Sequence, residues 1–195
     1  MISLEIENEN DYKDFFETIQ KTTDDISYCI NCIGLLSKDS LQPERKIEDI
    51  ELQSLLHTFM VNTSPTLLIA KYAKPFIRSS ASPIFCSLSA KVGSITDNKM
   101  GGWYSYRISK AALNMSLKNI SLEFSRINKK STTISIHPGT TESNLSKPFL
   151  ATAAKRYKIH TTKESAANIL NVLESCSPEK SNGQFYSWDG QTLPW

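Results

Sequence analysis

Glycine is scarce in this sequence of 195 residues, which has only seven glycines and none before Gly34. Residues 1–33 therefore contain no glycine-rich turn of the kind that binds phosphate through backbone N–H groups. Basic and acidic residues nearly balance, 22 against 20, so neither nucleic acid nor a membrane surface is expected as a partner. No apolar run approaches the roughly 20 residues of a membrane span. The acidic start, MISLEIENENDYKD, is no signal peptide, and a cytoplasmic protein is expected.

Cysteine is also sparse, with four residues, of which Cys29 and Cys32 have the spacing of a redox or metal pair. This pair lies in the apolar run ISYCINCIGLL, a predicted strand, where residues three apart point to opposite faces. There is no second CxxC, and the three histidines are scattered along the chain. The favoured interpretation is a set of buried, inert thiols in a reducing compartment, with no metal site.

The sequence does contain a regular alternation of short apolar runs and long periodic ones, which predicts a single α/β domain over residues 1–195. Strands are expected at 2–6, 26–34, 82–90, 131–137 and 183–190, and helices at 11–20, 46–77, 103–126 and 161–175. The second helix should be irregular at 62–65, where Pro65 falls, and Thr161 and Glu164 have capping-box spacing. Strict alternation predicts a doubly wound parallel sheet with helices on both faces.

Tyr106 and Lys110 carry the most specific chemical signal, because residues four apart share one face of a helix. An ammonium close to a phenol favours the phenolate and lowers a pKa that is ordinarily about 10. For this spacing alone, a solvated surface pair is the better interpretation. The neighbouring segments favour a functional pair instead. Hydroxyl residues follow two predicted strands, at the carboxyl ends where open α/β sheets bind ligands.

Six segments extend this pattern: NCIGLL, LHTFMVNT, SLSAKVGSITDN, GGWYSYRISKAALN, HPGTTESNLSKPF and GQFYSWDGQTLPW. In order and wording they resemble the short-chain dehydrogenase/reductases, specifically the C-factor-like (Sniffer-like carbonyl reductase) branch, over nearly the whole chain. The resemblance implies a Rossmann-like doubly wound sheet. It also implies that the chain starts where relatives reach their third strand, so that the first two strands and the glycine-rich turn are lacking.

The resemblance assigns roles to individual residues. Tyr106 would be the general acid/base, Lys110 would tune it, and Asn62 would hold a water that links Lys110 to solvent. Relatives have a substrate-orienting serine where this chain has Ala90, so the adjacent Ser89 is assigned that role. Residues expected at the cofactor are Glu5 near the adenine, Asn31, Ile33, Gly34, Tyr106, Lys110, Pro138, Gly139, Thr141 and Ser143.

These roles predict an NAD(P)-dependent oxidoreductase that acts on a small-molecule carbonyl or alcohol, with NADPH slightly favoured as the cofactor. The alternative is a truncated, non-catalytic C-factor-like protein with an interaction or signalling function. Since the phosphate-binding turn is lacking, the chain by itself is expected to bind dinucleotide poorly.

The resemblance also implies a homodimer or homotetramer, in which the helices matching 50–76 and 104–126 pack across a two-fold axis. The apolar positions expected to serve both core and interface are Leu52, Leu55, Leu56, Phe59, Leu113, Leu117 and Ile120.

Overall fold

The structure, a computed structural model, describes residues 3–37 and 41–195. Its centre is a four-stranded sheet in the order β1–β2–β3–β6, in which every neighbouring pair is parallel. The strands are β1 (Tyr28–Asn31), β2 (Ile84–Leu88), β3 (Thr132–His137) and β6 (Gln184–Ser187). The predicted parallel α/β architecture is therefore confirmed.

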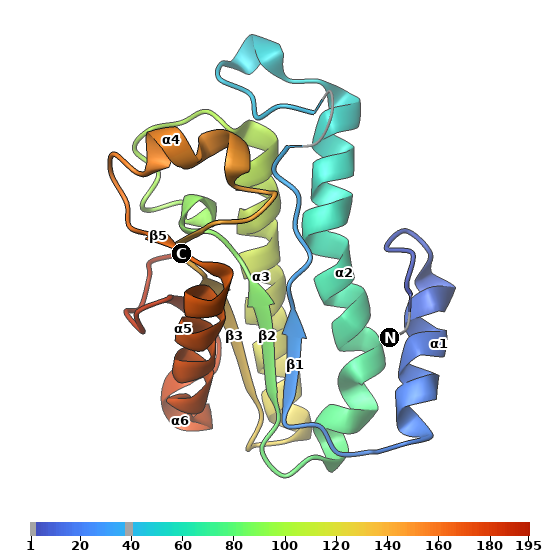
Figure 1. The fold of residues 1–195 in the computed structure, drawn as a ribbon. Helices are drawn as coiled ribbons and strands as arrows, with labels where there is room; N and C mark the ends of the chain where they lie inside the picture. The colour runs from blue at the N-terminus through green and yellow to red at the C-terminus, as the bar shows by residue number, and fades with distance from the viewer. Residues whose placement is uncertain (1–2, 38–40) are drawn as a thin grey trace.

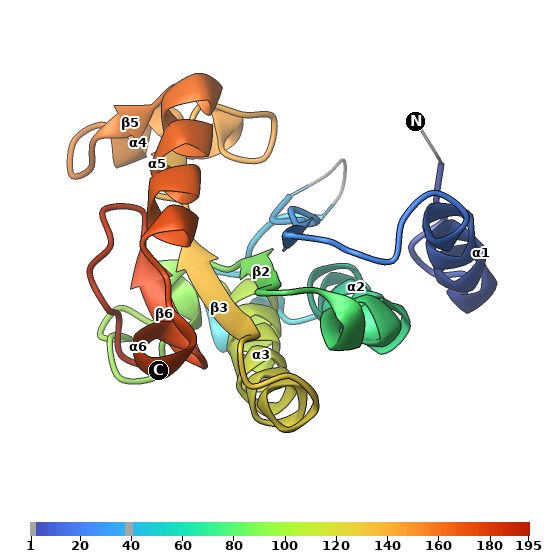
Figure 2. The same cartoon turned by 90° about the horizontal axis from the view of Figure 1, so that it is seen from below.

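Long helices cover both faces of this sheet (Figures 1 and 2). On one side lie α2 and α3, with α1 packed on the outer side of α2, and on the other side lies α5. Their bounds are α1 (Glu9–Gln20), α2 (Leu52–Ser79), α3 (Tyr104–Ile127) and α5 (Thr162–Glu174). The capping box of Thr161 and Glu164 at the start of α5 is confirmed.

Shorter elements fill the connections above the carboxyl ends of the strands and near the chain's end. Two short 3-10 helices, η1 (Ile47–Asp49) and η2 (Lys91–Gly93), precede α2 and follow β2. β4 (Thr140–Thr141) and β5 (Ile159–His160) form a small two-stranded sheet. The chain between them contains η3 (Lys147–Phe149) and α4 (Leu150–Ala153). The helix α6 (Pro178–Ser181) leads into β6. The periodicity of the sequence did not predict β4, β5 or α4, which are too short to show one.

The core consists of two layers, because successive strand residues point to opposite faces of the sheet. Phe85 packs with Leu113 and Leu117 of α3, and its ring lies edge-on to Phe124 at 5.7 Å. The next residue, Cys86, faces the other layer, where β3 packs against α5. Alternation along β2 thus places one helix layer on each face.

Two sequence predictions about the N-terminal half are wrong. Of the predicted strand at 2–6, residues 3–6 are described, and they form coil and a turn that leads into α1. A strand needs a partner for its backbone hydrogen bonds, and no described strand pairs with this segment.

β1 is an edge strand of the described sheet, because β2 is the one described strand that pairs with it. Its side chains Tyr28 and Ile30 are 45% and 37% exposed. β1 is therefore an exposed apolar edge of the described sheet.

The predicted irregularity at 62–65 is also wrong, because α2 runs unbroken from Leu52 to Ser79. Pro65 has no N–H and leaves one helical hydrogen bond unmade. The turn is instead held from outside, by Asn62 and Thr63. Asn62 Nδ2 donates to Ser109 Oγ at 2.9 Å, and Thr63 Oγ1 donates to the carbonyl oxygen of Ser109 at 2.9 Å.

Candidate active site

Tyr106 and Lys110 lie one turn apart on α3, beside the carboxyl end of β2. Tyr106 is 8% exposed and Lys110 is 3% exposed. Lys110 Nζ donates a hydrogen bond to the carbonyl oxygen of Leu88 at 2.9 Å and lies 5.9 Å from the centre of the Tyr106 ring. The structure therefore brings a phenol and an amine together in a buried place at the end of a parallel strand.

Burial decides the protonation of both groups. It raises the pKa of the Tyr106 phenol well above its ordinary value, and it lowers the pKa of Lys110 to about 8. The spacing of the two residues predicted that the ammonium would lower the phenol pKa; in this structure desolvation of the buried phenol raises it instead. Burial thus favours the neutral form of both groups.

Gly34 lies beside Lys110, with room for no more than a methyl group between them. A methyl group built on Gly34 would lie 3.5 Å from Lys110 Nζ, 3.8 Å from Asn62 Oδ1 and 3.8 Å from Leu145 Cδ1. These are ordinary contact distances, so a larger side chain would fill the space that the amine faces. Asn62 itself is engaged with the neighbouring backbone: it accepts from Leu35 N at 2.6 Å and donates to Leu35 O at 2.8 Å.

Asn31 shapes the end of β1, where the cofactor residues were expected. Its side-chain oxygen accepts from Ile33 N at 3.0 Å, and its amide nitrogen donates to Thr66 Oγ1 at 2.8 Å. Thr66 in turn bonds with Ser87 of β2 at 3.0 Å. Asn31 and Ile33 therefore form a turn that is fixed to α2 just before Gly34.

Ala90, rather than Ser89, is the residue of this strand end that packs with Tyr106. Ala90 belongs to a buried apolar cluster with Leu36 and Tyr106, bordered by Val92, Trp103, Leu145 and Phe149. Ser89 is 4% exposed, and its hydroxyl has no hydrogen-bond partner among the described residues. The substrate-orienting role of Ser89 stays a prediction.

The segment after β3 is anchored by a close backbone approach. Gly139 has a φ of +77°, and a methyl group there would lie 2.8 Å from Trp188 Cδ1 and 3.0 Å from His160 Cδ2, so only glycine fits. Thr141 Oγ1 donates to Ser165 Oγ at 2.9 Å, and Ser165 donates to Pro138 O at 3.3 Å.

The remaining predicted residues lie at the edge of this constellation or away from it. Ser143 is exposed at the start of the segment that carries η3 and α4. Glu5 is exposed in the segment that leads into α1, and its backbone N–H donates to Asp11 Oδ2 at 2.9 Å. Figures 1 and 2 show α1 on the far side of α2 from β3. No contact of the described residues joins Glu5 to the Tyr106 site.

Two residues at this site were not predicted as functional. Trp103 has a left-handed φ of 52°, rare for a bulky residue, and its ring lies 6.2 Å from that of Tyr106 and 5.2 Å from that of Phe149. Glu44 is 5% exposed and contacts the first turn of α3. From the sequence, the aromatic side chain of Trp103 indicated packing. Glu44 is a single glutamate in a polar loop, and no pattern in the sequence indicated that it would contact α3.

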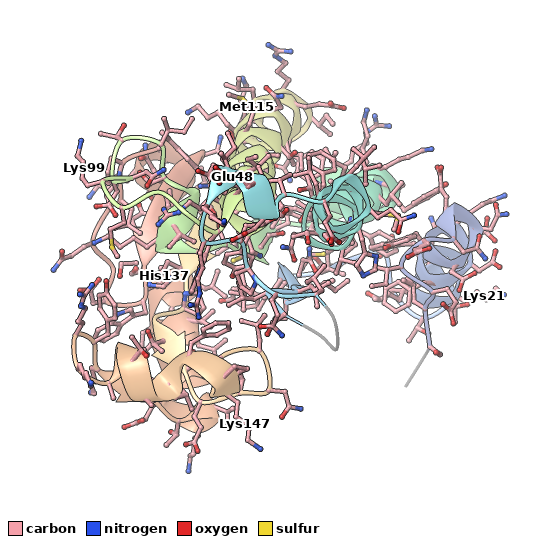
Figure 3. All side chains as sticks on the ribbon, turned by 90° about the horizontal axis from the view of Figure 1, so that it is seen from above. Lys21, Glu48, Lys99, Met115, His137 and Lys147 are labelled. Carbon is pink, nitrogen blue, oxygen red and sulfur yellow. The ribbon has the colours of Figure 1, made fainter. Side chains whose placement is uncertain are left out.

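His137 is the last residue of β3 and is partly buried (labelled in Figure 3). Burial, and secondarily the charge of Lys91, lowers the pKa of His137 to about 4, and its Nδ1 has no partner among the described residues. His137 is therefore best described as a packed strand residue whose surroundings favour the neutral imidazole.

Comparison with known proteins identifies relatives over nearly the whole chain. A family model described as enoyl-(acyl carrier protein) reductase matches residues 1–182. C-signal of Myxococcus xanthus is 28% identical over 147 residues, which are 75% of this chain and 82% of that protein. The chain spans between 44% and 65% of the length of the other curated relatives that it matches.

Solved structures with the same fold include carbonyl reductases. The carbonyl reductase Sniffer of D. melanogaster has a TM-score of 0.83 at 25% identity, with 99% of this chain and 77% of that chain covered. The NADPH-bound carbonyl reductase from chicken fatty liver has a TM-score of 0.84 at 23% identity, with 100% and 76% covered. In the described residues, no helix has both the length and the apolar composition needed to cross a membrane.

Lys110 should make the free energy of unfolding depend on pH in a defined window. The pKa of its amine is 10.5 in the unfolded reference and about 8 in the fold. Between these values the unfolded chain binds more protons than the folded one, so stability rises as the pH increases through the window. Below about pH 8 the cost of burying the charge is fully present.

We therefore expect the parent chain to gain about 2 kcal/mol of unfolding free energy relative to Lys110→Met between roughly pH 7 and pH 9.5. Urea unfolding of both proteins at both pH values measures this gain. The subtraction removes the tyrosine and cysteine titrations, which the two proteins share. An identical pH dependence in both would contradict the lowered pKa.

Proposed function

We propose that this chain, which belongs to the short-chain dehydrogenase/reductase family, is an NAD(P)-dependent oxidoreductase that interconverts a carbonyl and an alcohol. The observation that carries the proposal is the buried pair of Tyr106 and Lys110 at the carboxyl end of a parallel strand. We further propose a reducing compartment such as the cytoplasm, since all four thiols are free.

The nicotinamide side of a dinucleotide fits the residues around Lys110. Among the described residues the amine donates to Leu88 O alone, so it keeps further hydrogens for ribose hydroxyls, and the neighbouring Gly34 has no side chain to block them. When bound, the nicotinamide supplies hydride to a carbonyl or accepts it from an alcohol. We favour NADPH slightly, because a structure similar in fold is a carbonyl reductase with NADPH bound.

Further residues would complete this side of the site. They are Asn31 and Ile33 after β1, and Pro138, Gly139, Thr141 and Ser143 after β3. Glu5 remains a proposal for the adenine side, supported by the family resemblance alone.

Tyr106 would transfer the proton. Because burial favours the neutral phenol, Tyr106 holds a proton that it can donate to a carbonyl oxygen during reduction. A charged Lys110 would then stabilise the phenolate that remains. Asn62 Oδ1 and Lys110 Nζ both lie within 4 Å of one position over Gly34, which supports a role for Asn62 in relaying a proton through water.

Replacement of Tyr106 by phenylalanine tests the proton transfer. Tyr106→Phe removes only the hydroxyl, so we expect carbonyl reduction to fall by about 100-fold or more while NADPH affinity changes little. Turnover with a panel of carbonyl substrates and NADPH fluorescence titration measure the two quantities. Most of the activity surviving in Tyr106→Phe would rule out the role.

A non-catalytic interaction or signalling protein is the alternative, and one observation favours it. The side chain just after β2 that packs against Tyr106 is the methyl group of Ala90, which cannot donate a hydrogen bond to a substrate oxygen. NADPH titration of the purified chain distinguishes the two functions. Measurable binding supports the enzyme, and none at millimolar nucleotide supports the alternative.

The two candidate hydroxyl positions give a second prediction. Neighbouring residues of an extended strand point to opposite sides, so a hydroxyl at position 90 faces Tyr106 better than Ser89 does. We expect Ala90→Ser to increase kcat/KM by about tenfold or more, since a hydrogen bond to the reacting oxygen lowers the barrier. Ser89→Ala should change it less than about twofold. A large loss in Ser89→Ala with no gain in Ala90→Ser would instead assign the role to Ser89.

We also propose that the chain forms a homodimer through the outer face of α2 and α3, from which a homotetramer can be built. The structure corrects the expected residue set, because Leu113, Leu117 and Ile120 lie in the core and do not serve an interface. Exposed apolar side chains on the two helices are Leu52, Leu56, Phe59, Leu67, Ile108, Met115 and Leu122. Together they give the two helices enough apolar surface to support self-association.

Sedimentation at micromolar concentration tests this dimer. We expect the parent to sediment as a dimer or tetramer, and Leu56→Glu with Met115→Glu to sediment as a monomer because charge replaces the apolar contact. The control is Ile95→Glu, in a loop and 79% exposed, which should leave the oligomer intact. A parent that is monomeric at this concentration would contradict the proposal.

A further inference from the structure

The loop between β1 and α2 places a buried carboxylate at the first turn of α3. Glu44 is 5% exposed, and its two oxygens accept from Ser105 N at 3.3 and 3.2 Å. The Ser105 hydroxyl donates to the same carboxylate, and Trp103 N donates to the backbone oxygen of Glu44 at 2.6 Å. The loop therefore binds α3 through both side chain and backbone.

This contact supplies a cap that α3 does not make for itself. The first N–H groups of a helix have no partner within the helix. The residue before α3 is Trp103, whose side chain makes no capping hydrogen bond. Glu44 lies 61 positions from Ser105 in sequence, and its charge is of the sign that the start of a helix dipole favours.

The carboxylate has few other ways to be satisfied. None of the salt bridges found among the described residues includes Glu44. A buried carboxylate without donors is costly, so Glu44 and the start of α3 stabilise each other. The pair also lines a small cavity of about 10 Å³, together with Leu36, Thr58 and Tyr106.

We propose that Glu44 is a positioning residue for Tyr106. Tyr106 follows Ser105 directly, in the same turn of α3, so the hydrogen bonds from Ser105 to Glu44 fix the turn that carries the phenol. Through this contact the conformation of the 41–51 loop determines where the phenol lies. The proposal rests on the proposed function, in which Tyr106 transfers the proton.

Fluorine NMR of the chain with 3-fluorotyrosine at its seven tyrosines tests the position of the phenol without requiring turnover. Tyr106→Phe assigns the Tyr106 resonance. We expect Glu44→Ala to shift or broaden it and Glu44→Gln to do so less, because glutamine keeps an acceptor oxygen without the charge. The Tyr12 resonance should stay in place, since Tyr12 belongs to α1 and donates to Ile6 O. The matched control is Glu48→Gln, an exposed glutamate of the same loop (Figure 3).

Amide hydrogen exchange gives a second readout. We expect residues 104–107 to exchange about tenfold faster in Glu44→Ala, as for a lost helix cap, with the rest of α3 unchanged. If Glu44→Ala does not fold, Ser105→Ala removes the hydroxyl donor alone and should shift the Tyr106 resonance in the same direction. A Tyr106 resonance and first-turn exchange unchanged in the folded variants would overturn the proposal. Equal changes at Tyr12 would also overturn it, because they indicate general loosening.

Kinetics separate this proposal from the proposed function. In a catalytically active parent, Glu44→Gln should lower kcat about tenfold with KM little changed, since the substrate site is intact and only the donor is misplaced. If the parent shows no turnover, the proposed function fails, while the NMR and exchange results still decide the role of Glu44.

Discussion

Close contact between α3 and the carboxyl end of β2 is the constraint on which the rest of the structure depends. Just after β2, a methyl group at Gly93 would lie 2.8 Å from Lys110 Cβ and 2.9 Å from its carbonyl carbon, so η2 lies directly against the backbone of α3. Lower on the same helix, Leu113 and Leu117 pack against Phe85. The contact that builds the core therefore also carries Tyr106 and Lys110 to the end of the sheet.

That depth of burial gives the site its electrostatic character. A phenol and an amine in contact with water would lie near their ordinary pKa values, and a close ammonium would favour the phenolate. Here desolvation acts on each group separately and favours the neutral form of both. Any event that lets water or an anionic ligand reach Lys110 would raise the pKa of its amine and favour its charged form. The protonation of the pair is thus linked to how the space beside Gly34 is filled.

Local patterns in the sequence predicted most of the architecture. The apolar period at 103–126 gave α3, the Thr161 and Glu164 spacing gave the start of α5, and strict alternation gave the parallel sheet. The predictions failed where long-range contacts decide the outcome. Residues 3–6 have the composition of a strand without a described partner, and α2 is held across Pro65 by hydrogen bonds to α3. Periodicity also showed that α3 has apolar faces without showing which of them enters the core.

The candidate site divides in the same way. The spacing of Tyr106 and Lys110 was sufficient to predict a shared helix face, but the capping of that helix by Glu44 comes from a distant loop and leaves no local signal. The glycines show how closely other parts of the chain approach Lys110. Five of the seven have positive φ in turns, and the other two, Gly34 and Gly93, both lie against Lys110. At Gly93 a methyl group would overlap the backbone of α3, so only glycine lets η2 lie directly against the helix that carries Lys110. At Gly34 a methyl group would make ordinary contacts with Lys110 Nζ and Asn62 Oδ1, so only a side chain larger than that of alanine would crowd the amine.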